Sequence, residues 1–100
     1  MANANYQRGV RFERDIISET KSEGYETLRT AGSHGFADVI AINEKLVRLI
    51  QGKVTKDAKP RINAYKADIA KILAIKCPPN VTRELWIKLD RQKPYKVLVL

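Results

Sequence analysis

Apolar residues recur at helical spacing in two parts of the chain. In residues 7–23 they return about every third or fourth position, and Gly24 just beyond them is typical of a helix end. Residues 61–76 repeat the pattern, and the Pro-Pro pair at 78–79 cannot continue a helix. The two apolar stripes consist of Val10, Phe12, Ile16, Ile17 and Thr20, and of Ile62, Tyr65, Ile69, Ile72 and Leu73. The pattern therefore predicts one helix near the start of the chain and another in its second half.

Strand composition dominates most of the remaining chain. The predicted strands are residues 25–30, 37–42, 46–54, 82–89 and 95–100. A short turn joins 37–42 to 46–54, which predicts a hairpin, and the apolar density of 46–54 favours a strand buried on both faces. The resulting order, αβββαββ, is typical of an α/β fold with a mixed sheet. Because the chain is short and has neither repeats nor a linker, residues 1–100 are expected to form a single domain.

One acidic residue lies on the apolar side of the first predicted helix. On a wheel of about 100° per residue, Glu13 falls between Ile16 and Ile17. Burying an unpaired carboxylate costs on the order of several kcal/mol, so Glu13 needs a partner. A metal ion, a basic residue or several hydrogen-bond donors would each serve. An ion pair with one of the basic residues therefore stays open beside a functional site.

Three more polar residues stand on apolar sides of the predicted hairpin. Asp38 shares a side with the isoleucines of its strand, although a single aspartate at a strand start is most often a surface or turn residue. On the partner strand, Gln51 and Lys53 point to the same side, about 7 Å apart. Gly52 between them leaves room for close packing on the opposite side. Two polar residues on the apolar side of a central strand indicate a site.

The hairpin brings Asp38 toward Gln51 and Lys53, and we predict that they form one site with Glu13. Carboxylate and amide oxygens are the ligands that hard cations such as Mg²⁺ take, so Glu13, Asp38 and Gln51 are the candidate metal ligands. Such an ion suits phosphodiester hydrolysis, because it activates water and neutralises the phosphate. Lys53 would stabilise the negative transition state or lower the pKa of the attacking water. These four residues are therefore the candidate catalytic residues.

Charge directs this chemistry toward nucleic acid. The chain has 19 Lys and Arg against 11 Asp and Glu, a net charge of +8, which favours a polyanionic partner over a basic protein that is merely soluble. Basic residues gather in sequence around the candidate site and are predicted to contact DNA phosphates, which position DNA without reading its sequence. These residues are Arg8, Arg11, Arg14, Arg29, Lys56 and Lys59.

Other features of composition bear on location. The single cysteine, Cys77, permits no intrachain disulfide, the first residues are polar, and no apolar run approaches the ~20 residues that cross a bilayer. The chain is therefore expected in the cytoplasm, or in the host cytoplasm if it is viral, without a membrane partner. His34, the one histidine, is more often a solvated loop residue than a metal ligand, so a histidine-based nuclease is not favoured.

The ordered set of candidate residues resembles a known nuclease superfamily. Ala37-Asp38, followed by Gln51-Gly52-Lys53, is similar to the PD-(D/E)XK motif. Over residues 6–56 the chain resembles the archaeal and viral Holliday-junction resolvases. The matching segments are Arg8-Gly9, Glu13-Arg14, Leu28-Arg29-Thr30-Ala31-Gly32-Ser33, Asp38-Val39-Ile40-Ala41 and Leu49-Ile50-Gln51-Gly52-Lys53-Val54-Thr55-Lys56. The resemblance implies a restriction-endonuclease-like fold, with a mixed central sheet flanked by helices.

The resemblance also implies an activity and roles for residues. Members of the family are homodimers that bind four-way DNA junctions and make paired, opposed nicks with Mg²⁺ or Mn²⁺. By this resemblance Glu13, Asp38 and Gln51 bind the metal, Lys53 is the catalytic lysine and Ser33 is the serine of the active-site loop. The basic positions that contact substrate phosphates or support the site are Arg8, Arg14 and Arg29.

Two residues depart from the family pattern. Ala37 stands where proline is usual, and Gln51 stands where the last motif usually has glutamate. A glutamine still offers a metal one neutral oxygen, but the loss of a negative charge is expected to lower metal affinity unless Glu13 compensates. We interpret Gln51 as natural variation, and an engineered inactivating change is the other interpretation.

Other functions remain open at this point. The chain is alternatively another nuclease of the same fold acting in repair or restriction, or a DNA-binding module that has lost its metal and its catalysis. An RNA-binding protein of the ribosomal type is a further alternative. Cleavage of junctions rather than linear duplex separates a Holliday-junction resolvase from another nuclease of the same fold. Metal binding separates both nucleases from the non-catalytic module.

Symmetry bears on the assembly. A four-way junction has two-fold symmetry and two opposed strands must be cut, so a C₂ homodimer with two identical sites is predicted. The second predicted helix and the end of the chain offer apolar material for an interface, although residues 97–100 are alternatively a covered sheet strand. The residues are Ala64, Ala67, Ala70, Ala74, Val97, Leu98, Val99 and Leu100.

Overall fold

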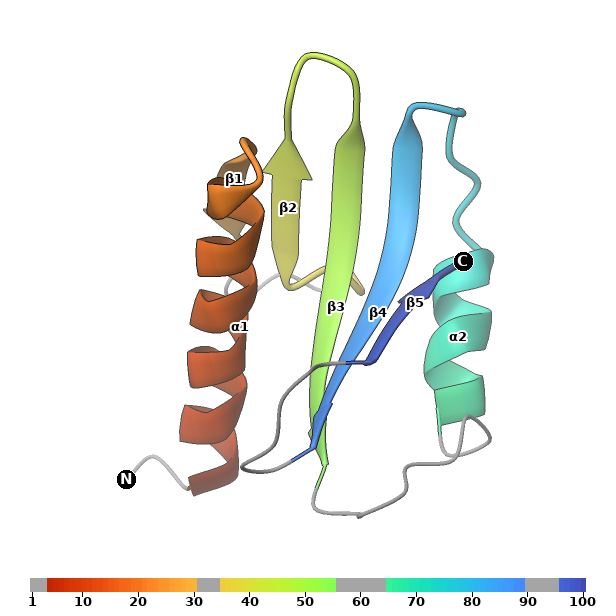
Figure 1. The fold of residues 1–100 in the computed structure, drawn as a ribbon. Helices are drawn as coiled ribbons and strands as arrows, with labels where there is room; N and C mark the ends of the chain where they lie inside the picture. The colour runs from red at the N-terminus through yellow and green to blue at the C-terminus, as the bar shows by residue number, and fades with distance from the viewer. Residues whose placement is uncertain (1–3, 31–34, 56–64, 90–95) are drawn as a thin grey trace.

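The computed structural model describes residues 4–30, 35–55, 65–89 and 96–100 (Figure 1). The helices are α1 (Ala4–Ser22) and α2 (Lys66–Leu73). The strands are β1 (Glu26–Arg29), β2 (Val39–Ile42), β3 (Val47–Thr55), β4 (Val81–Leu89) and β5 (Lys96–Val99). The predicted element order αβββαββ is confirmed.

The five strands form one sheet in the order β1-β2-β3-β4-β5. Every neighbouring pair is antiparallel except β3 and β4, which run parallel, so the predicted mixed sheet is confirmed. Parallel neighbours need a crossover connection, and the chain between β3 and β4 carries α2. The predicted hairpin is β2 and β3, whose turn is closed by Asn43: its Oδ1 accepts hydrogen bonds from the backbone N–H groups of Lys45 and Leu46, at 2.9 and 2.8 Å.

Each helix covers its own face of the sheet. A core of Phe12, Ile16, Val39, Ala41, Ile50 and Trp86 lies between α1 and the sheet, and a second core of Tyr65, Ile72, Leu85 and Ile87 lies beneath α2. A Cβ added at Gly52 would come within 2.9 Å of Ile16 Cδ1 and 3.1 Å of Phe12 Cδ2. The predicted close packing at Gly52 is therefore that of α1 on β3, and the face that α2 covers is the opposite one.

The prediction that the third strand is buried on both faces was only partly right. Ile50 is fully buried, whereas the other positions of β3 are half-buried. The reason is the placement of α2, which packs mainly against β4 and leaves part of its face of β3 open. Gln51 and Lys53 lie on this partly open face.

The helix ends follow from local hydrogen bonding. Gly24 adopts a positive φ of 96°, the Tyr25 N–H reaches the Thr20 carbonyl at 3.1 Å and the Gly24 N–H reaches Lys21 at 3.0 Å, which is the C-terminal motif that glycine favours. The second helix is shorter than predicted. It ends at Leu73 rather than residue 76, and Arg83 of β4 donates hydrogen bonds to the carbonyl of Leu73 and to that of Ile75 just beyond the helix. Residues 61–64 lie outside the described residues.

Neither of the described helices combines the length and apolar character needed to span a membrane.

Candidate active site

Asp38 is held between two strands by its backbone. Its N–H donates to the Ile50 carbonyl of β3 at 2.8 Å, and its carbonyl accepts the N–H of Thr30, which follows β1, at 3.0 Å. Its side chain is oriented as well, because Oδ2 accepts a hydrogen bond from the Gly52 N–H at 2.9 Å. The Thr30 hydroxyl donates to the Ala37 carbonyl and so supports the segment that precedes Asp38. The carboxylate is thus fixed beside the middle of β3.

The environment of this carboxylate disfavours its charge. Burial raises the pKa of Asp38 above its ordinary value, and the nearby Glu13 carboxylate raises that pKa further. The hydrogen bond from Gly52 and the positive charges of Lys53 and Arg29 act in the opposite direction without cancelling the effect of burial. A buried carboxylate near a second one is an arrangement that an added cation would relieve.

Gln51 and Lys53 flank Gly52 and therefore point away from α1, toward the face that α2 covers. Gln51 Oε1 is buried and has no hydrogen-bond partner among the described residues. Lys53 Nζ lies 3.5 Å from Asp68 Oδ1 on α2. Both side chains line an open pocket of about 390 Å³. The complete lining is Gly35, Phe36, Gln51, Lys53, Asp68, Lys71 and Ile75.

Glu13 approaches from α1 and is only 17% exposed, as its place in the apolar stripe predicted. Its Oε2 forms an ion pair with Arg29 Nε at 3.2 Å, so the ion-pair alternative is also found. The four predicted residues do not share one face of the sheet: Glu13 belongs to the α1 face, and Gln51 and Lys53 to the other. Asp38 connects the two groups, because both Glu13 and Lys53 act on its pKa.

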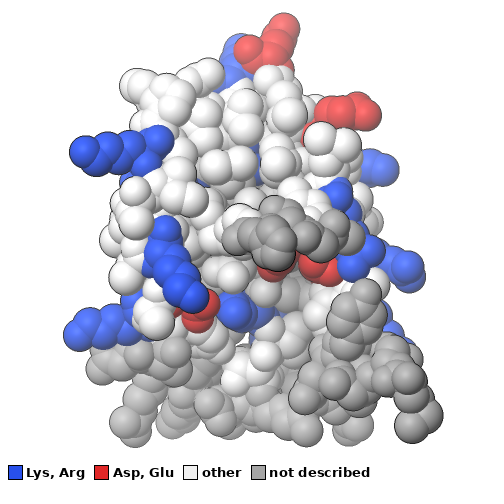
Figure 2. All heavy atoms as spheres, turned by 180° about the vertical axis from the view of Figure 1, so that it is seen from behind, with Lys and Arg blue, Asp and Glu red and all other residues white. Residues whose placement is uncertain are grey.

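The predicted DNA-binding residues are only partly described. Arg11, Arg14 and Arg29 are exposed. The side chain of Arg8 and the whole of Ser33, His34, Lys56 and Lys59 lie outside the described residues. Figure 2 shows Lys and Arg side chains along both edges of the view from behind, around a largely uncharged upper centre.

The donor set fits a hard cation in its chemistry. Among the described residues, no three His, Cys, Asp or Glu side chains come together as a metal site. This follows from the residue types, because position 51 offers an amide instead of a third acid and Glu13 is paired with Arg29. The buried Gln51 Oε1, which has no hydrogen-bond partner in the described part of the chain, is nevertheless an oxygen of the kind that a hard cation binds. That Glu13, Asp38 and Gln51 converge within one coordination shell stays a prediction.

Two residues of α2 were missed by the sequence reasoning. Asp68 and Lys71 line the pocket with Gln51 and Lys53, but α2 was considered only for its apolar stripe. Asp68 lies three residues after Tyr65 and four before Ile72, both of which are buried. That spacing is the signal that identified Glu13 on α1, and it would have singled out Asp68 too.

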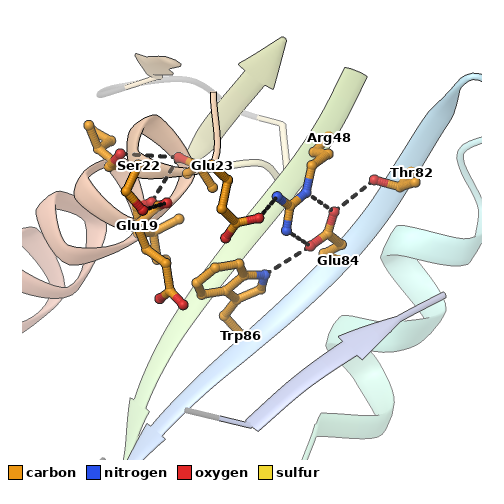
Figure 3. Close-up of polar contacts among 10 residues, drawn as sticks. Glu19, Ser22, Glu23, Arg48, Thr82, Glu84 and Trp86 are labelled. Carbon is orange, nitrogen blue, oxygen red and sulfur yellow. Dashed lines mark hydrogen bonds and ion pairs between the residues drawn. The ribbon is translucent and has the colours of Figure 1, made fainter. Parts of the chain in front are cut away.

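A second polar cluster lies elsewhere along β3 (Figure 3). Arg48 binds both oxygens of Glu84, with Nε–Oε2 and Nη2–Oε1 distances of 2.8 Å. Thr82 and Trp86 donate to the same carboxylate at 2.7 and 3.0 Å, and Glu23 at the end of α1 accepts from Arg48 at 3.3 Å. Glu84 is only 2% exposed. Burial by itself would raise the pKa of Glu84, but the hydrogen bonds from Arg48, Thr82 and Trp86 outweigh it and lower that pKa.

The mixed sheet, with its acid-and-lysine site at the β2–β3 pair, has the fold of a restriction-endonuclease-like nuclease. A solved structure with this fold is Archaeoglobus fulgidus Hjc, described as a Holliday junction resolvase from an archaeal hyperthermophile. It is 22% identical, with a TM-score of 0.64, and the match covers 88% of this chain and 72% of that chain. The archaeal Holliday junction resolvase (Hjc) family matches residues 4–99.

The match spans nearly the whole sequence, so this chain belongs to the archaeal Holliday junction resolvase family. The resemblance found in residues 6–56 is thereby confirmed, and it extends through the second half of the chain. The predicted function, resolution of Holliday junctions by a nuclease, is confirmed with it.

Proposed function

We propose that this resolvase cuts four-way DNA junctions with Mg²⁺, for which Mn²⁺ substitutes, at the site between α1, β2 and β3. One observation carries the proposal. The Asp38 carboxylate is oriented by Gly52 and is close enough to Lys53 for the ammonium to act on its pKa, and the buried Gln51 Oε1, which has no hydrogen-bond partner among the described residues, belongs to a side chain that lines a pocket with Lys53. Two oxygen donors next to a cationic side chain suit a metal-assisted attack on a phosphodiester.

Each side chain has a distinct part in this proposal. Asp38, Gln51 and Glu13 would hold the ion, and for Glu13 this requires partial release from Arg29. The bound ion would neutralise the scissile phosphate and lower the pKa of the attacking water. Lys53 would stabilise the negative charge that develops on the phosphate oxygens, in a pocket where water competes less than in bulk.

Substrate binding would rest on phosphate contacts. Arg11, Arg14 and Arg29 are exposed on α1 and β1, close in sequence to the ligands of the proposed metal. With Arg8, Lys56 and Lys59 they are proposed to neutralise junction phosphates, and Ser33 is proposed to support the active-site loop. Such binding weakens steeply as salt rises, because each neutralised phosphate releases a counterion.

The proposed assembly is a homodimer acting in the cytoplasm. In the described part of the chain, large apolar side chains stay exposed at Leu28 and Ile42 on β1 and β2, at Leu73 and Ile75 around the end of α2, and at Val97 and Val99 on β5. Of residues 97–100, Leu98 and Leu100 pack on the core beneath α2, as the alternative of a covered strand predicted, while Val97 and Val99 face outward and stay available for the proposed interface. A second copy would cover part of this surface and supply the second cut.

The decisive experiment compares a synthetic four-way junction with a linear duplex of the same sequence. We expect Mg²⁺-dependent paired nicks on the junction, no cutting in EDTA, and little cutting of the duplex. Light scattering on the same preparation should give the mass of a dimer. Equal cutting of both substrates would contradict the proposal, and a monomer that still makes paired nicks would remove the link between symmetry and function.

Gln51 favours one alternative, a junction-binding protein that does not cut. Position 51 lacks the acid that the family pattern has, and the described residues offer no three-acid site. The same assay decides: this alternative predicts a shifted junction in gel electrophoresis and no product with either Mg²⁺ or Mn²⁺. Cleavage by the protein with Gln51 in place would exclude it.

A further inference from the structure

Lys53 has an acidic neighbour that comes from a different element. Lys53 Nζ lies 3.5 Å from Asp68 Oδ1, and the two side chains are 37% and 27% exposed. Both line the pocket that also contains Gln51. Lys53 also lowers the pKa of Asp38 through its positive charge, so its ammonium interacts with both the Asp38 and the Asp68 carboxylate.

We propose that Asp68 is a positioning residue for Lys53, which holds the ammonium at the pocket where the scissile phosphate is to bind. The proposal rests on the function proposed above and adds α2 to the catalytic machinery. A lysine reaches its target through a long, flexible stem, so an unheld Lys53 would sample many rotamers. An ion pair with a fixed partner reduces that freedom before substrate arrives.

Asp68 is well placed to act as the fixed partner. It stands in the first turn of α2, and that helix is anchored to the sheet by Ile72, which is fully buried against the core with Leu85 and Ile87. On β3 itself, the position two residues before Lys53 is the neutral Gln51 instead of an acid. The carboxylate that faces Lys53 across the pocket is therefore supplied by α2.

The chain contains a matched pair outside the pocket. Lys88 Nζ lies 3.4 Å from Asp15 Oδ2, almost the same distance, and joins α1 to β4 on the other face of the sheet. Asp15→Asn removes the same charge from an ion pair of the same kind. It serves as the control for effects of net charge and of ion-pair loss in general.

The test uses the full chain and single-turnover cleavage of a four-way junction at saturating enzyme, with junction affinity measured separately in Ca²⁺. We expect Asp68→Asn to slow cleavage about 10–100-fold, because misplacing a reacting group by an ångström costs that much. Junction affinity should be unchanged or slightly tighter, since the change removes a negative charge near DNA. Asp68→Glu should recover much of the rate, and Asp15→Asn should stay within twofold of the wild type.

A second variant separates positioning from folding. Asp68 also places a negative charge in the first turn of α2, where it stabilises the helix. The double variant Lys66→Gln/Asp68→Asn keeps the net charge, and it removes a positive charge from the same first turn, which offsets the stabilisation that the helix loses with Asp68. It should melt and bind the junction like the wild type and still cut as slowly as Asp68→Asn.

A readout that does not depend on cleavage is the ¹H–¹⁵N signal of the Lys53 ammonium, assigned with Lys53→Arg. We expect this signal to be retained in Asp15→Asn and lost in both Asp68→Asn variants. Cleavage by Asp68→Asn within twofold of wild type, equal losses in Asp68→Glu and Asp68→Asn, or an unchanged Lys53 signal would each overturn the proposal. A wild type that leaves junctions uncut would refute the proposed function instead, and the ammonium signal alone would then decide the role of Asp68.

Discussion

Two polar clusters lie along β3, and their carboxylates differ in how fully they are hydrogen-bonded and in the direction of their pKa shifts. At Arg48, the Glu84 carboxylate is almost fully buried, and each of its oxygens receives two hydrogen bonds. Gln51 lies three residues further along β3, about 10 Å away on a strand. Within the described ranges, the Asp38 carboxylate accepts one hydrogen bond, from the Gly52 N–H, and Gln51 Oε1 accepts none. Accordingly the pKa of Glu84 is lowered, while that of Asp38 is raised.

The difference is the one expected between a polar group that stabilises the fold and the group that we propose binds a ligand. A buried ion pair is tolerated only when the remaining lone pairs are satisfied, and Glu84 meets that condition. The Asp38 and Gln51 oxygens do not meet it in the protein alone. Their unsatisfied state costs stability and leaves ligand positions that a cation or a substrate would complete.

The largest expected effect is on folding stability, at the cluster formed by Arg48 and Glu84. Among the described residues, Glu84→Gln leaves Arg48 with the partly exposed Glu23 as its one ionic partner. The change should cost about 3–5 kcal/mol of folding free energy. Because the pKa of Glu84 is lowered in the folded state, its contribution is present above the ordinary value of 4.5 and is lost as pH falls through the folded pKa. Urea unfolding followed by Trp86 fluorescence should show a constant gap to wild type from pH 7 to about 5 that closes in more acid solution. A pH-independent gap would contradict this account.

The next largest expected effect is on cleavage activity, at Asp38. Asp38→Asn should slow junction cleavage about 10²–10³-fold. It should nevertheless stabilise the metal-free fold by up to about 1 kcal/mol, since Asn keeps an acceptor for the Gly52 N–H without the buried charge. The sign of this stability change follows from the raised pKa of Asp38. Below the ordinary pKa of 3.8 the carboxyl contributes stability to the fold, and that contribution is lost as pH rises through the folded-state pKa. Thermal melting of Asp38→Asn and wild type in EDTA, at pH 7 and pH 4, measures this difference in stability. A variant less stable than wild type at pH 7 would contradict the contrast between Asp38 and Glu84.

A smaller effect concerns the missing charge at position 51. Gln51→Glu should lower the Mg²⁺ concentration for half-maximal cleavage by about tenfold, because ligand charge tunes cation affinity. Activity found only in this variant would mean that the chain with Gln51 is inactive. Asn80→Asp, the same chemical change at an exposed turn before β4, is the control and should leave the Mg²⁺ requirement as it is. Loss of cleavage in Gln51→Glu would contradict the placement of position 51 in the site.

The smallest expected effect is on the folding free energy, and it also concerns position 51. Since Gln51 Oε1 has no hydrogen-bond partner among the residues that the structure describes, Gln51→Met is expected to remove no hydrogen bond from that oxygen and to change the folding free energy by no more than about 0.5 kcal/mol. Chemical denaturation at pH 7, beside Glu84→Gln, makes the contrast direct. A loss of several kcal/mol would show that the Gln51 amide stabilises the fold, as Glu84 does.

Local patterns in the sequence were enough for the element order, the β2–β3 hairpin and the family. The helical and strand periods depend on neighbours a few residues away, and the turn at Asn43 and the stop at Gly24 are equally local. The same periods singled out Glu13, Asp38, Gln51 and Lys53, because a polar residue on an apolar side is visible in the sequence alone. The close packing expected at Gly52 was confirmed for this reason too.

The partners of these residues were decided only by the tertiary structure. Alternation along β4 places Glu84 on a side with Thr82, Trp86 and Lys88, a pattern that by itself reads as largely polar. The side is buried because Trp86 joins the core beneath α1, and the parallel register, which pairs Arg48 with Thr82, brings the Arg48 side chain within hydrogen-bond distance of Glu84.

The division of the site between two faces was decided in the same way. Glu13 lies on the α1 face with Arg29, while Gln51 and Lys53 meet Asp68, which is fifteen residues beyond Lys53 and on another element. The helical or strand period of a sequence predicts which side chains are buried, but it does not predict the strand register or how a helix docks on the sheet. Those depend on contacts between distant segments, and here they determine which charge neutralises which.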